Sequence, residues 1–353
     1  MPVFIKGVGC ISPQPTYNGQ FLNELTAYTG EYFTSAEPDY KAYLNPALIR
    51  RMGKILKMGV ASASICLQDA KVENPDAIIT GTGLGCIVDT DKFLTAIIEN
   101  EEQFLTPTNF IQSTHNTISA QIALSLKCLN YNFTYVHRGF SLESALQDSI
   151  MMLKEGEAKD ILVGGVDEIT QTYYAITKRM GFWKKNVEGH LSLAKANTKG
   201  TIAGEGATYF VLSQEESSSN YAELKDLATI YRPKDIEEIE SELHKFLEKN
   251  DLAVNDLDLV ILGINGDQRG DQVYHDLANG LFKDQSLAYF KHLSGEYPTS
   301  VAFGVWMGAK IMKSQEIPSG VILENANKGE IKNILIYNHY RDINHSIYLL
   351  THI

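Results

Sequence analysis

Residues 132–164 read NFTYVHRGFSLESALQDSIMMLKEGEAKDILVG, and no other stretch of the chain says more about its architecture. A short apolar run at Asn132–His137 passes directly into an amphipathic helix pattern at Leu142–Glu155, and a second short apolar run covers Asp160–Gly164. Two short apolar runs separated by one amphipathic helix are typical of a β-α-β unit. The stretch therefore predicts an α/β fold built on a parallel or mixed sheet.

The same alternation continues on both sides of this stretch. Further strands are expected at Val3–Val8, Ala77–Thr80, Thr208–Leu212, Tyr221–Ile230, Leu257–Ile264, Ile331–Tyr337 and Ser346–Thr351. Further helices are expected at Arg50–Ala70, Thr90–Glu102, Ser119–Leu126, Asp235–Lys249, Asp271–Leu281 and Val301–Ser314. The polar segment EESSSN at Glu215–Asn220 separates two series of similar order. We therefore expect two halves, residues 1–216 and 221–353, related by an internal duplication.

The composition narrows the classes of function. The chain has 353 residues, a hydrophobic fraction of 44% and a formal net charge of −12. This acidic balance argues against nucleic-acid binding, because contact with phosphates requires a basic surface. The first residues do not resemble a secretion signal, and no window approaches the roughly 20 apolar residues that cross a bilayer. We expect a cytoplasmic protein without cofactor or metal, whose four scattered cysteines are reduced and buried.

Two glycine-rich segments carry little weight when each is taken alone. Gly81–Gly85 reads GTGLG, and its third glycine comes one residue early for a dinucleotide fingerprint, so a structural turn is favoured. The segment GEGA at Gly204–Ala207 predicts a turn with a buried carboxylate at Glu205.

The junction between strand and helix at Arg138–Ser141, here called the elbow, has two interpretations. A sharp strand-to-helix turn can hold a nucleophile beside a helix N-terminus, where the helix dipole stabilises negative charge. Ser141 is the candidate nucleophile, but the same residue suits the N-cap of the helix that follows. The N-cap interpretation is favoured.

Six segments, taken in order, resemble those of the β-ketoacyl-ACP synthases and their polyketide relatives. They are KGVGCISP at 6–13, GTGLGCIVDTDKF at 81–93, TPTNFIQSTHNTISAQIAL at 106–124, DILVGGVDE at 160–168, GEGATYFVL at 204–212 and KHLSGEYPTSVAFG at 291–304. The match spans nearly the whole chain. The resemblance implies a thiolase-like, five-layer α-β-α-β-α fold of two duplicated halves with mixed sheets, dimerised through the elbow region.

The condensing residues of that family are missing from this chain. By resemblance, an elbow cysteine takes up the acyl group and two histidines act on the malonyl unit. The cysteine position falls on Phe140 and the second histidine position on Glu296. Asn265–Asp271, which corresponds to the first histidine, contains Asp267 but no histidine, and Asn338–Asn344 replaces the glycine-rich oxyanion loop. Because catalytic residues act as a unit, condensation by this chain alone is expected to be lost.

The leading hypothesis from the resemblance is a non-catalytic, chain-length-factor-like subunit. Such a subunit pairs with an active β-ketoacyl-ACP synthase in fatty-acid, polyketide or aryl-polyene chain elongation and meets an acyl carrier protein. Phe140 is expected to limit the product tunnel, and the resemblance puts His115, Gln112 and Arg138 at the tunnel or the dimer interface. The basic residues Lys178, Arg179, Lys184 and Lys185 are candidates for contact with the acidic carrier, although an ordinary solvated surface is the favoured interpretation.

Four residues that match the family motifs are expected to have structural roles. Lys291 is kept from the motif and is expected to pair with Glu296, because an unpaired buried ion is costly. Gly204, Glu205 and Gly206 are expected to retain their structural part in the fold.

Two other functions stay open at the level of the sequence. One is acyl transfer or hydrolysis by Ser141 together with a histidine at position 137, 115 or 292. The other is a homodimeric, synthase-like binding protein that has no partner synthase.

Overall fold

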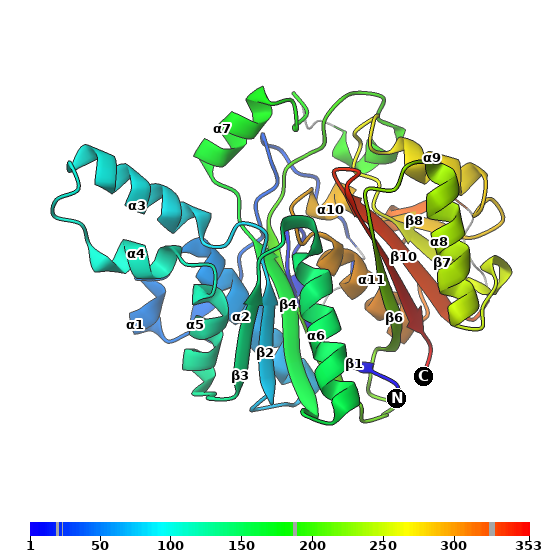
Figure 1. The fold of residues 1–353 in the computed structure, drawn as a ribbon, viewed down its shortest axis with the longest axis horizontal. Coiled ribbons are helices and arrows are strands. Elements are labelled where there is room, and N and C mark those ends of the chain that lie inside the picture. The colour runs from blue at the N-terminus through cyan, green and yellow to red at the C-terminus, as the bar shows by residue number, and fades with distance from the viewer. Residues whose placement is uncertain (19–20, 23, 186–188, 325–328) are drawn as a thin grey trace.

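The computed structural model describes residues 1–18, 21–22, 24–185, 189–324 and 329–353. Within these residues the strands join in the order β3-β2-β4-β5-β1-β6-β11-β10-β7-β8-β9 (Figure 1). The first half supplies β1 (Phe4–Ile11), β2 (Ala77–Gly81), β3 (Tyr131–Tyr135), β4 (Asp160–Asp167) and β5 (Gly206–Ser213). The second half supplies β6 (Ala222–Tyr231), β7 (Leu259–Leu262), β8 (Leu287–Tyr289), β9 (Ile322–Glu324), β10 (Asn333–Tyr340) and β11 (Asn344–Thr351).

The two halves repeat one topology. The order β3-β2-β4-β5-β1 of the first half recurs in the second as β8-β7-β10-β11-β6, strand for strand. The parallel pairs of β2 with β3 and β4 recur as those of β7 with β8 and β10, and the antiparallel pairs of β5 recur as those of β11. The half-sheets join where β1 meets β6, through Phe4 opposite Glu223 and Ile5 opposite Ala222. The mixed sheets and the duplication are confirmed.

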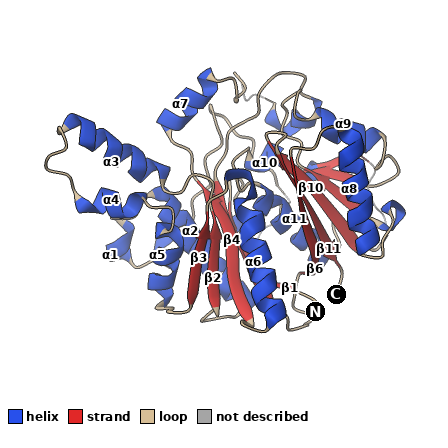
Figure 2. Cartoon of the chain, viewed as in Figure 1, coloured by secondary structure: helices blue, strands red, loops and turns tan. Residues whose placement is uncertain are grey.

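Helices cover and separate the two half-sheets (Figure 2). Helices α2 (Lys54–Ala70) and α5 (Thr117–Leu126) pack on the outer face of the first half-sheet. Helices α6 (Ser141–Glu155) and α11 (Val301–Ser314) lie between the half-sheets. Helices α8 (Ile236–Lys249) and α9 (Gln272–Asn279) pack on the outer face of the second half-sheet. This arrangement confirms the five-layer α-β-α-β-α fold.

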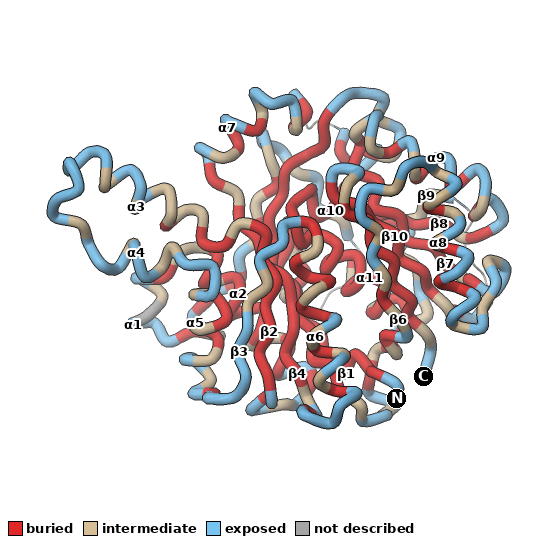
Figure 3. Tube along the Cα trace, in the orientation of Figure 1, coloured by how far each residue is buried: buried red, intermediate tan, exposed pale blue. Residues whose placement is uncertain are grey.

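The two middle helices differ in how their side chains are buried (Figure 3). Helix α6 buries Leu142, Ala145, Leu146, Ser149 and Leu153, a spacing of three and four residues that gives one apolar stripe. Helix α11 buries nearly every position, because it contacts strands of both half-sheets. The middle layer therefore contributes most of the shared core and holds the N-terminus of α6, where the elbow lies.

Six short elements escaped the sequence analysis. The two strands have only three residues each and the four helices four to nine, so most of them lack a recognisable apolar period. They are β8, β9, α1 (Pro46–Ile49), α4 (Pro107–Ser113), α7 (Gln171–Arg179) and α10 (Lys291–Ser294). Helix α4 packs against α3 (Ile87–Glu99), and together they form an arm that projects from the body (Figure 1).

Two further observations concern expectations from composition. All four cysteines are buried and free, as expected. Among the residues that the structure describes, no helix combines the length and the apolar character required to span a membrane.

Candidate functional site

The elbow keeps a strained turn but carries no thiol. Strand β3 leads into a single 3₁₀ turn at Arg138–Phe140, which is followed at once by α6. Arg138 adopts a left-handed backbone with φ of 50°, and a Cβ on Gly139 would lie 2.8 Å from Cβ of Tyr340. The half-buried ring of Phe140 stacks on His137, with 5.7 Å between ring centroids. At the position that the sequence resemblance assigns to the cysteine, this chain therefore presents a phenyl ring.

The hydroxyl of Ser141 is committed to the backbone of the elbow. Ser141 is fully buried, and its Oγ accepts the N–H of His137 at 2.8 Å and donates to the carbonyl of Thr82 at 2.9 Å. Its donor is thus used, and no described imidazole forms a hydrogen bond with it. Activation of a serine needs a base within hydrogen-bonding reach of its hydroxyl. This geometry argues against Ser141 as a nucleophile.

The predicted N-cap role of Ser141 is wrong. The 3₁₀ turn that precedes α6 makes Phe140 the N-cap residue and Ser141 the first helical residue. The hydroxyl therefore points back into the elbow instead of capping an N–H of α6.

Of the three histidines named as partners, His292 is buried and bonds the carbonyl of Gly320 through Nε2, while His115 is exposed beside Gly85.

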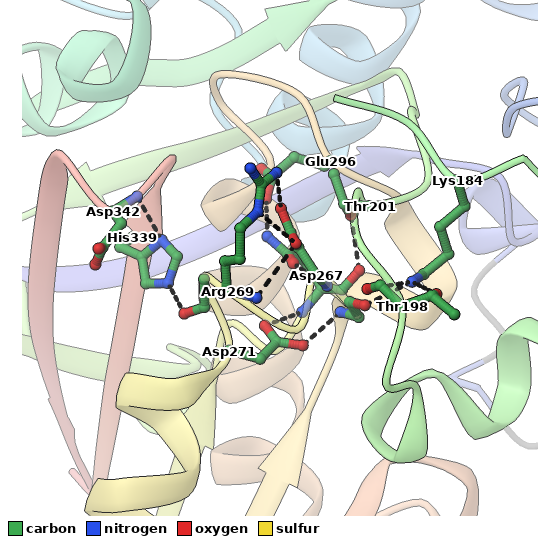
Figure 4. A network of polar contacts seen from close by, with 12 residues as sticks. Lys184, Thr198, Thr201, Asp267, Arg269, Asp271, Glu296, His339 and Asp342 are labelled. Atoms are coloured by element: carbon green, nitrogen blue, oxygen red, sulfur yellow. Dashed lines mark hydrogen bonds and ion pairs between the residues drawn. The ribbon is translucent and has the colours of Figure 1, made fainter. Parts of the chain in front are cut away.

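A pocket of about 290 Å³ opens near the elbow, where loops from both halves meet. It is lined by aromatic, charged and amide side chains from five segments: Phe182, Trp183, Thr201, Asn265, Asp267, Arg269, Gly270, Glu296, His339, Tyr340, Arg341 and Asp342. Figure 4 shows the polar network beneath and around it. Two of the positions identified as degenerate from the sequence, Asp267 and Glu296, thus line one pocket.

A buried ion pair involves Glu296, the residue that the sequence resemblance aligns with the second histidine. Nζ of Lys291 lies 2.7 Å from Oε2 of Glu296, and the two side chains are 0% and 4% exposed. Glu296 also accepts hydrogen bonds from Asn265 at 2.8 Å and from Ser300 at 3.1 Å, and Lys291 donates to the carbonyl of His339 at 3.1 Å. The charges are mutually compensated, so the expected pairing is present. Neither group is free to act on a bound molecule.

The loop Asn265–Asp271, which the sequence resemblance aligns with the first histidine, is organised by a second buried carboxyl group. Asp271 accepts the N–H groups of Asn265 at 2.9 Å and Gly266 at 2.6 Å. Burial raises the pKa of Asp271 to about 7, against the opposing effect of these hydrogen bonds. Asp267 lies at the pocket surface and pairs with Arg269 at 3.3 Å (Figure 4). Hydrogen bonds and an ion pair within the loop therefore fix its conformation, and the loop contains no histidine.

Lys184 binds the same loop from inside the protein, so its predicted place on the surface is wrong. Its side chain is buried, and Nζ donates to the carbonyl of Gly266 at 2.6 Å and to Oγ1 of Thr198 at 2.7 Å (Figure 4). Desolvation lowers the pKa of Lys184. The sequence carried no sign of this role, because the carbonyl of Gly266 is distant along the chain.

His339 was missed by the sequence analysis and is the imidazole that lines the pocket. Its Nε2 donates to the carbonyl of Gly270 at 2.7 Å, and its Nδ1 accepts the N–H of Asp342 at 3.0 Å. The ring stacks on Tyr274, with 4.7 Å between centroids, and burial lowers its pKa well below the ordinary value. Both nitrogens are therefore engaged, and the neutral ring is held in one tautomer as a structural element.

The segment GEGA has the buried carboxylate that the sequence predicted. Glu205 accepts the N–H of Ser35 at 2.9 Å and the hydroxyl of the same residue, and it pairs with Lys54. Gly204 and Gly206 lie where backbone from neighbouring segments approaches closely, so that a Cβ at either position would collide. These contacts hold the segment around Ser35 against the start of α2 and of β5, away from the pocket.

Of the four residues assigned to the tunnel or the interface, Gln112 and His115 lie on one outer side of the first half, whereas Arg138 and Phe140 lie in the elbow. Gln112 donates from Nε2 to the carbonyl of Arg51 at 2.9 Å, and His115 follows on the exposed connection to α5. Strand β3 forms the edge of the sheet and pairs with β2 along one side. Exposed apolar side chains gather on β3 and on the neighbouring α4 and α5: Phe110, Ile111, Leu124, Tyr131, Phe133 and Val136.

Comparison with known proteins agrees with this architecture. Residues 32–218, more than half of the chain, match the family model described as the β-ketoacyl synthase N-terminal domain. No curated protein sequence matches the chain.

Solved structures of low sequence identity share the fold over the whole chain. A structure described as the ishigamide ketosynthase/chain length factor has a TM-score of 0.82 and 17% identity, covering 100% of this chain and 99% of that one. A β-ketoacyl synthase from Burkholderia phymatum STM815 has a TM-score of 0.80 and 16% identity with the same coverage. A type II polyketide acyl-carrier protein in complex with its ketosynthase has a TM-score of 0.75 and 14% identity, again with coverage of 100% and 99%.

Proposed function

Because the chain belongs to the β-ketoacyl synthase family, we propose that it acts as a chain-length-factor-like subunit that pairs with an active β-ketoacyl-ACP synthase. The observation that carries the proposal is the elbow, where the half-buried ring of Phe140 stands in place of a nucleophile. The ion pair of Lys291 with Glu296 supports it, since charges that compensate each other fill the second histidine position. A solved structure with this fold is itself described as a ketosynthase/chain length factor.

The edge of β3 is the proposed surface for the partner synthase. An edge strand leaves unpaired N–H and C=O groups that another strand can bind. Tyr131 and Phe133 are exposed on this edge and their rings stack, with 6.1 Å between centroids. Phe110 and Ile111 on α4 extend the apolar surface. Burial of these rings and side chains supplies hydrophobic free energy for association, and the elbow follows directly after β3.

Within that assembly, Phe140 is proposed to form a wall of the product tunnel. The residue lies five positions beyond the end of the edge strand and is only half-buried in the single chain. A rigid ring at this place limits the chain length of the product by excluding further methylene groups. The chain is proposed to serve fatty-acid, polyketide or aryl-polyene elongation in the cytoplasm.

The basic surface near α7 is the proposed contact for an acyl carrier protein. Lys178, Lys184, Lys185 and Lys199 line a groove of about 530 Å³. Lys178 pairs with Glu31 at 2.7 Å and Lys184 is internal, so Lys185 and Lys199 provide most of the accessible charge. Such a patch on a chain of net charge −12 steers an acidic carrier by complementary charge.

The test is co-expression with the neighbouring synthase from the same genome, followed by size-exclusion chromatography and a malonyl-carrier condensation assay. We expect a stable heterodimer whose activity needs the partner's cysteine and tolerates loss of the Ser141 hydroxyl. Phe133→Lys, which puts a charge on the proposed edge, is expected to abolish the heterodimer, whereas Ile176→Lys on exposed α7 leaves it intact. Condensation by this chain alone would overturn the proposal.

A further inference from the structure

A second groove, of about 400 Å³, lies beside the elbow and is lined by three arginines. Arg138 comes from the elbow, Arg232 directly follows β6, and Arg341 lies in the turn between β10 and β11. The other lining residues are His137, Tyr231, Tyr340, Ile343 and Asn344. We call this groove, with these eight residues, the arginine groove.

The arginine groove contains positive charge that no carboxylate neutralises. Its lining includes neither Asp nor Glu, and all three arginines are exposed. In the part of the chain that the structure describes, none of the three guanidinium groups forms an ion pair or a hydrogen bond. Two of them contact aromatic rings: Arg232 lies over Tyr231 at 5.3 Å from the ring centroid, and Arg341 lies over Tyr340 at 5.1 Å and over Phe182 of the neighbouring pocket at 3.9 Å. On a chain of net charge −12, this concentration of unpaired cations is unusual.

The backbone at all three arginines is left-handed. Their φ angles are 50° at Arg138, 50° at Arg232 and 58° at Arg341. L-residues with large side chains rarely adopt this conformation, for which glycine and asparagine are better suited. Residues elsewhere in the chain also adopt this conformation, among them Lys71, Lys127 and Gln315 at helix ends, but the other four arginines do not. Backbone strain of this kind concentrates at ligand sites, where the side chain that it positions has a use.

We propose that the arginine groove binds a phosphate ester. A guanidinium group presents a planar fork of N–H donors that matches the oxygens of a phosphate. Three such groups suit a doubly charged phosphate with several oxygens better than a single carboxylate, which one or two arginines would satisfy. The site belongs to this chain alone, so the proposal goes beyond pairing with a synthase and stands without it.

The fold holds the arginines in position without using their charge. The N–H of Arg232 donates to the carbonyl of Ile343 at 2.8 Å, which ties the end of β6 to the turn that carries Arg341. Gly139 packs against Tyr340, which ties the elbow to the same turn. Three segments distant in the sequence are therefore joined by backbone contacts while their guanidinium groups remain available. Tyr340 and Arg341 also line the pocket of about 290 Å³ described above, so an ester bound in the groove can extend its organic part there.

The test is calorimetric titration of the purified full chain with inorganic phosphate and pyrophosphate, with succinate at matched ionic strength for comparison. We expect millimolar or tighter binding of phosphate and pyrophosphate, weakened by salt, and no matching response to succinate. Arg138→Asn, Arg232→Asn and Arg341→Asn are each expected to weaken binding about tenfold. Asparagine tolerates the left-handed backbone, so these variants keep the turns. Arg50→Asn, an exposed arginine outside the groove, is the matched control and should bind as the parent does.

The source of the phosphate is separated by a second pair of titrations. An acyl carrier protein with and without its phosphodiester-linked arm is titrated into the parent and into Arg232→Asn. Arm-dependent binding that Arg232→Asn weakens assigns the site to the carrier, and phosphate binding without any carrier response assigns it to a free phosphate ester.

Three outcomes would overturn the proposal. They are no binding of phosphate or pyrophosphate by the parent, equal binding of succinate, and groove variants that bind as the parent does. If the groove variants instead lose only the partner synthase, the arginines contact carboxylates of that protein and the phosphate assignment is wrong. Failure of the parent chain to form a heterodimer with the partner synthase, with phosphate binding intact, would refute the subunit proposal and leave this one standing.

Discussion

Breaking the ion pair between Lys291 and Glu296 should destabilise the protein strongly. The two groups lie 2.7 Å apart and are 0% and 4% exposed, so neither can be hydrated once its partner is removed. At an effective dielectric constant of about 20, their Coulomb attraction is about 6 kcal/mol. Because burial has already removed their hydration, the expected net cost of removing one charge is about 3–5 kcal/mol.

That cost can be converted into a shift of the melting temperature. An unfolding entropy of about 2.1 cal/mol/K per residue gives about 0.7 kcal/mol/K for 353 residues. A loss of about 4 kcal/mol therefore lowers Tm by about 5 °C. Glu296→Gln is the sharper of the two single variants, because glutamine keeps the shape of the side chain and one carbonyl oxygen that can accept from Asn265, while its amide N–H can donate to the hydroxyl of Ser300. The loss then reports the charge.

A double-mutant cycle measured by thermal and urea unfolding isolates the pair. Lys291→Met and Glu296→Gln should each lower stability, whereas the double variant should lose much less than the sum, because no unpaired charge remains. We expect a coupling free energy of about 2 kcal/mol or more. Additive losses, with coupling near zero, would refute the view that the old histidine site is filled by a compensating pair.

The remaining predictions concern the tunnel, one titrating carboxyl group and the elbow hydroxyl. Phe140→Ala in the assembled complex should lengthen the products seen by mass spectrometry, with exposed Phe104→Ala as control; identical products would exclude a gating role. Burial raises the pKa of Asp271 from 3.8 to about 7, so its ionisation should destabilise the folded state increasingly as pH rises from about 4 to 7. Asp271→Asn should therefore flatten this part of a stability–pH profile measured by urea unfolding, and an unchanged slope would contradict the assignment. Ser141→Ala should cost about 1–3 kcal/mol of stability, and a serine-directed phosphonate should label neither form; labelling of the parent that the variant loses would restore the hydrolase hypothesis.

The helices and strands that form the layers were predictable because each has its own repeat of apolar residues along the sequence. The helix expected at Val301–Ser314 has the observed bounds, and the strand expected at Ala77–Thr80 differs by one residue from the observed β2. The spacing of apolar residues shows which side chains are buried, and this spacing can be recognised from a few neighbouring positions. Three-residue β8 is too short for such a signal, and its strand order next to β7 depends on contacts between distant segments.

Predictions about the site could be made from the sequence only where the type of one residue rules out a reaction. Phe140 cannot attack a thioester in any conformation, and its identity sufficed. Lys184 was predicted to be exposed because most lysines are. It is buried because the carbonyl of Gly266 and the hydroxyl of Thr198 accept hydrogen bonds from its ammonium group. Ser141 fitted an N-cap pattern, but the extra 3₁₀ turn moved the cap to Phe140. Each of these outcomes was determined by partners far along the chain or by one added turn.

The strained backbone of the elbow at Arg138 has no explanation in the packing of Phe140 alone. A left-handed arginine costs about 1–2 kcal/mol of conformational free energy, and a turn this tight is not needed to hold a phenyl ring. The geometry is explained if the turn serves both proposed sites, with Phe140 directed to the tunnel and Arg138 to the arginine groove. Arg138→Asn keeps the turn and removes the charge, while Phe140→Ala keeps the charge and removes the ring. If the first variant loses phosphate alone and the second changes product length alone, one strained turn supports two separable functions.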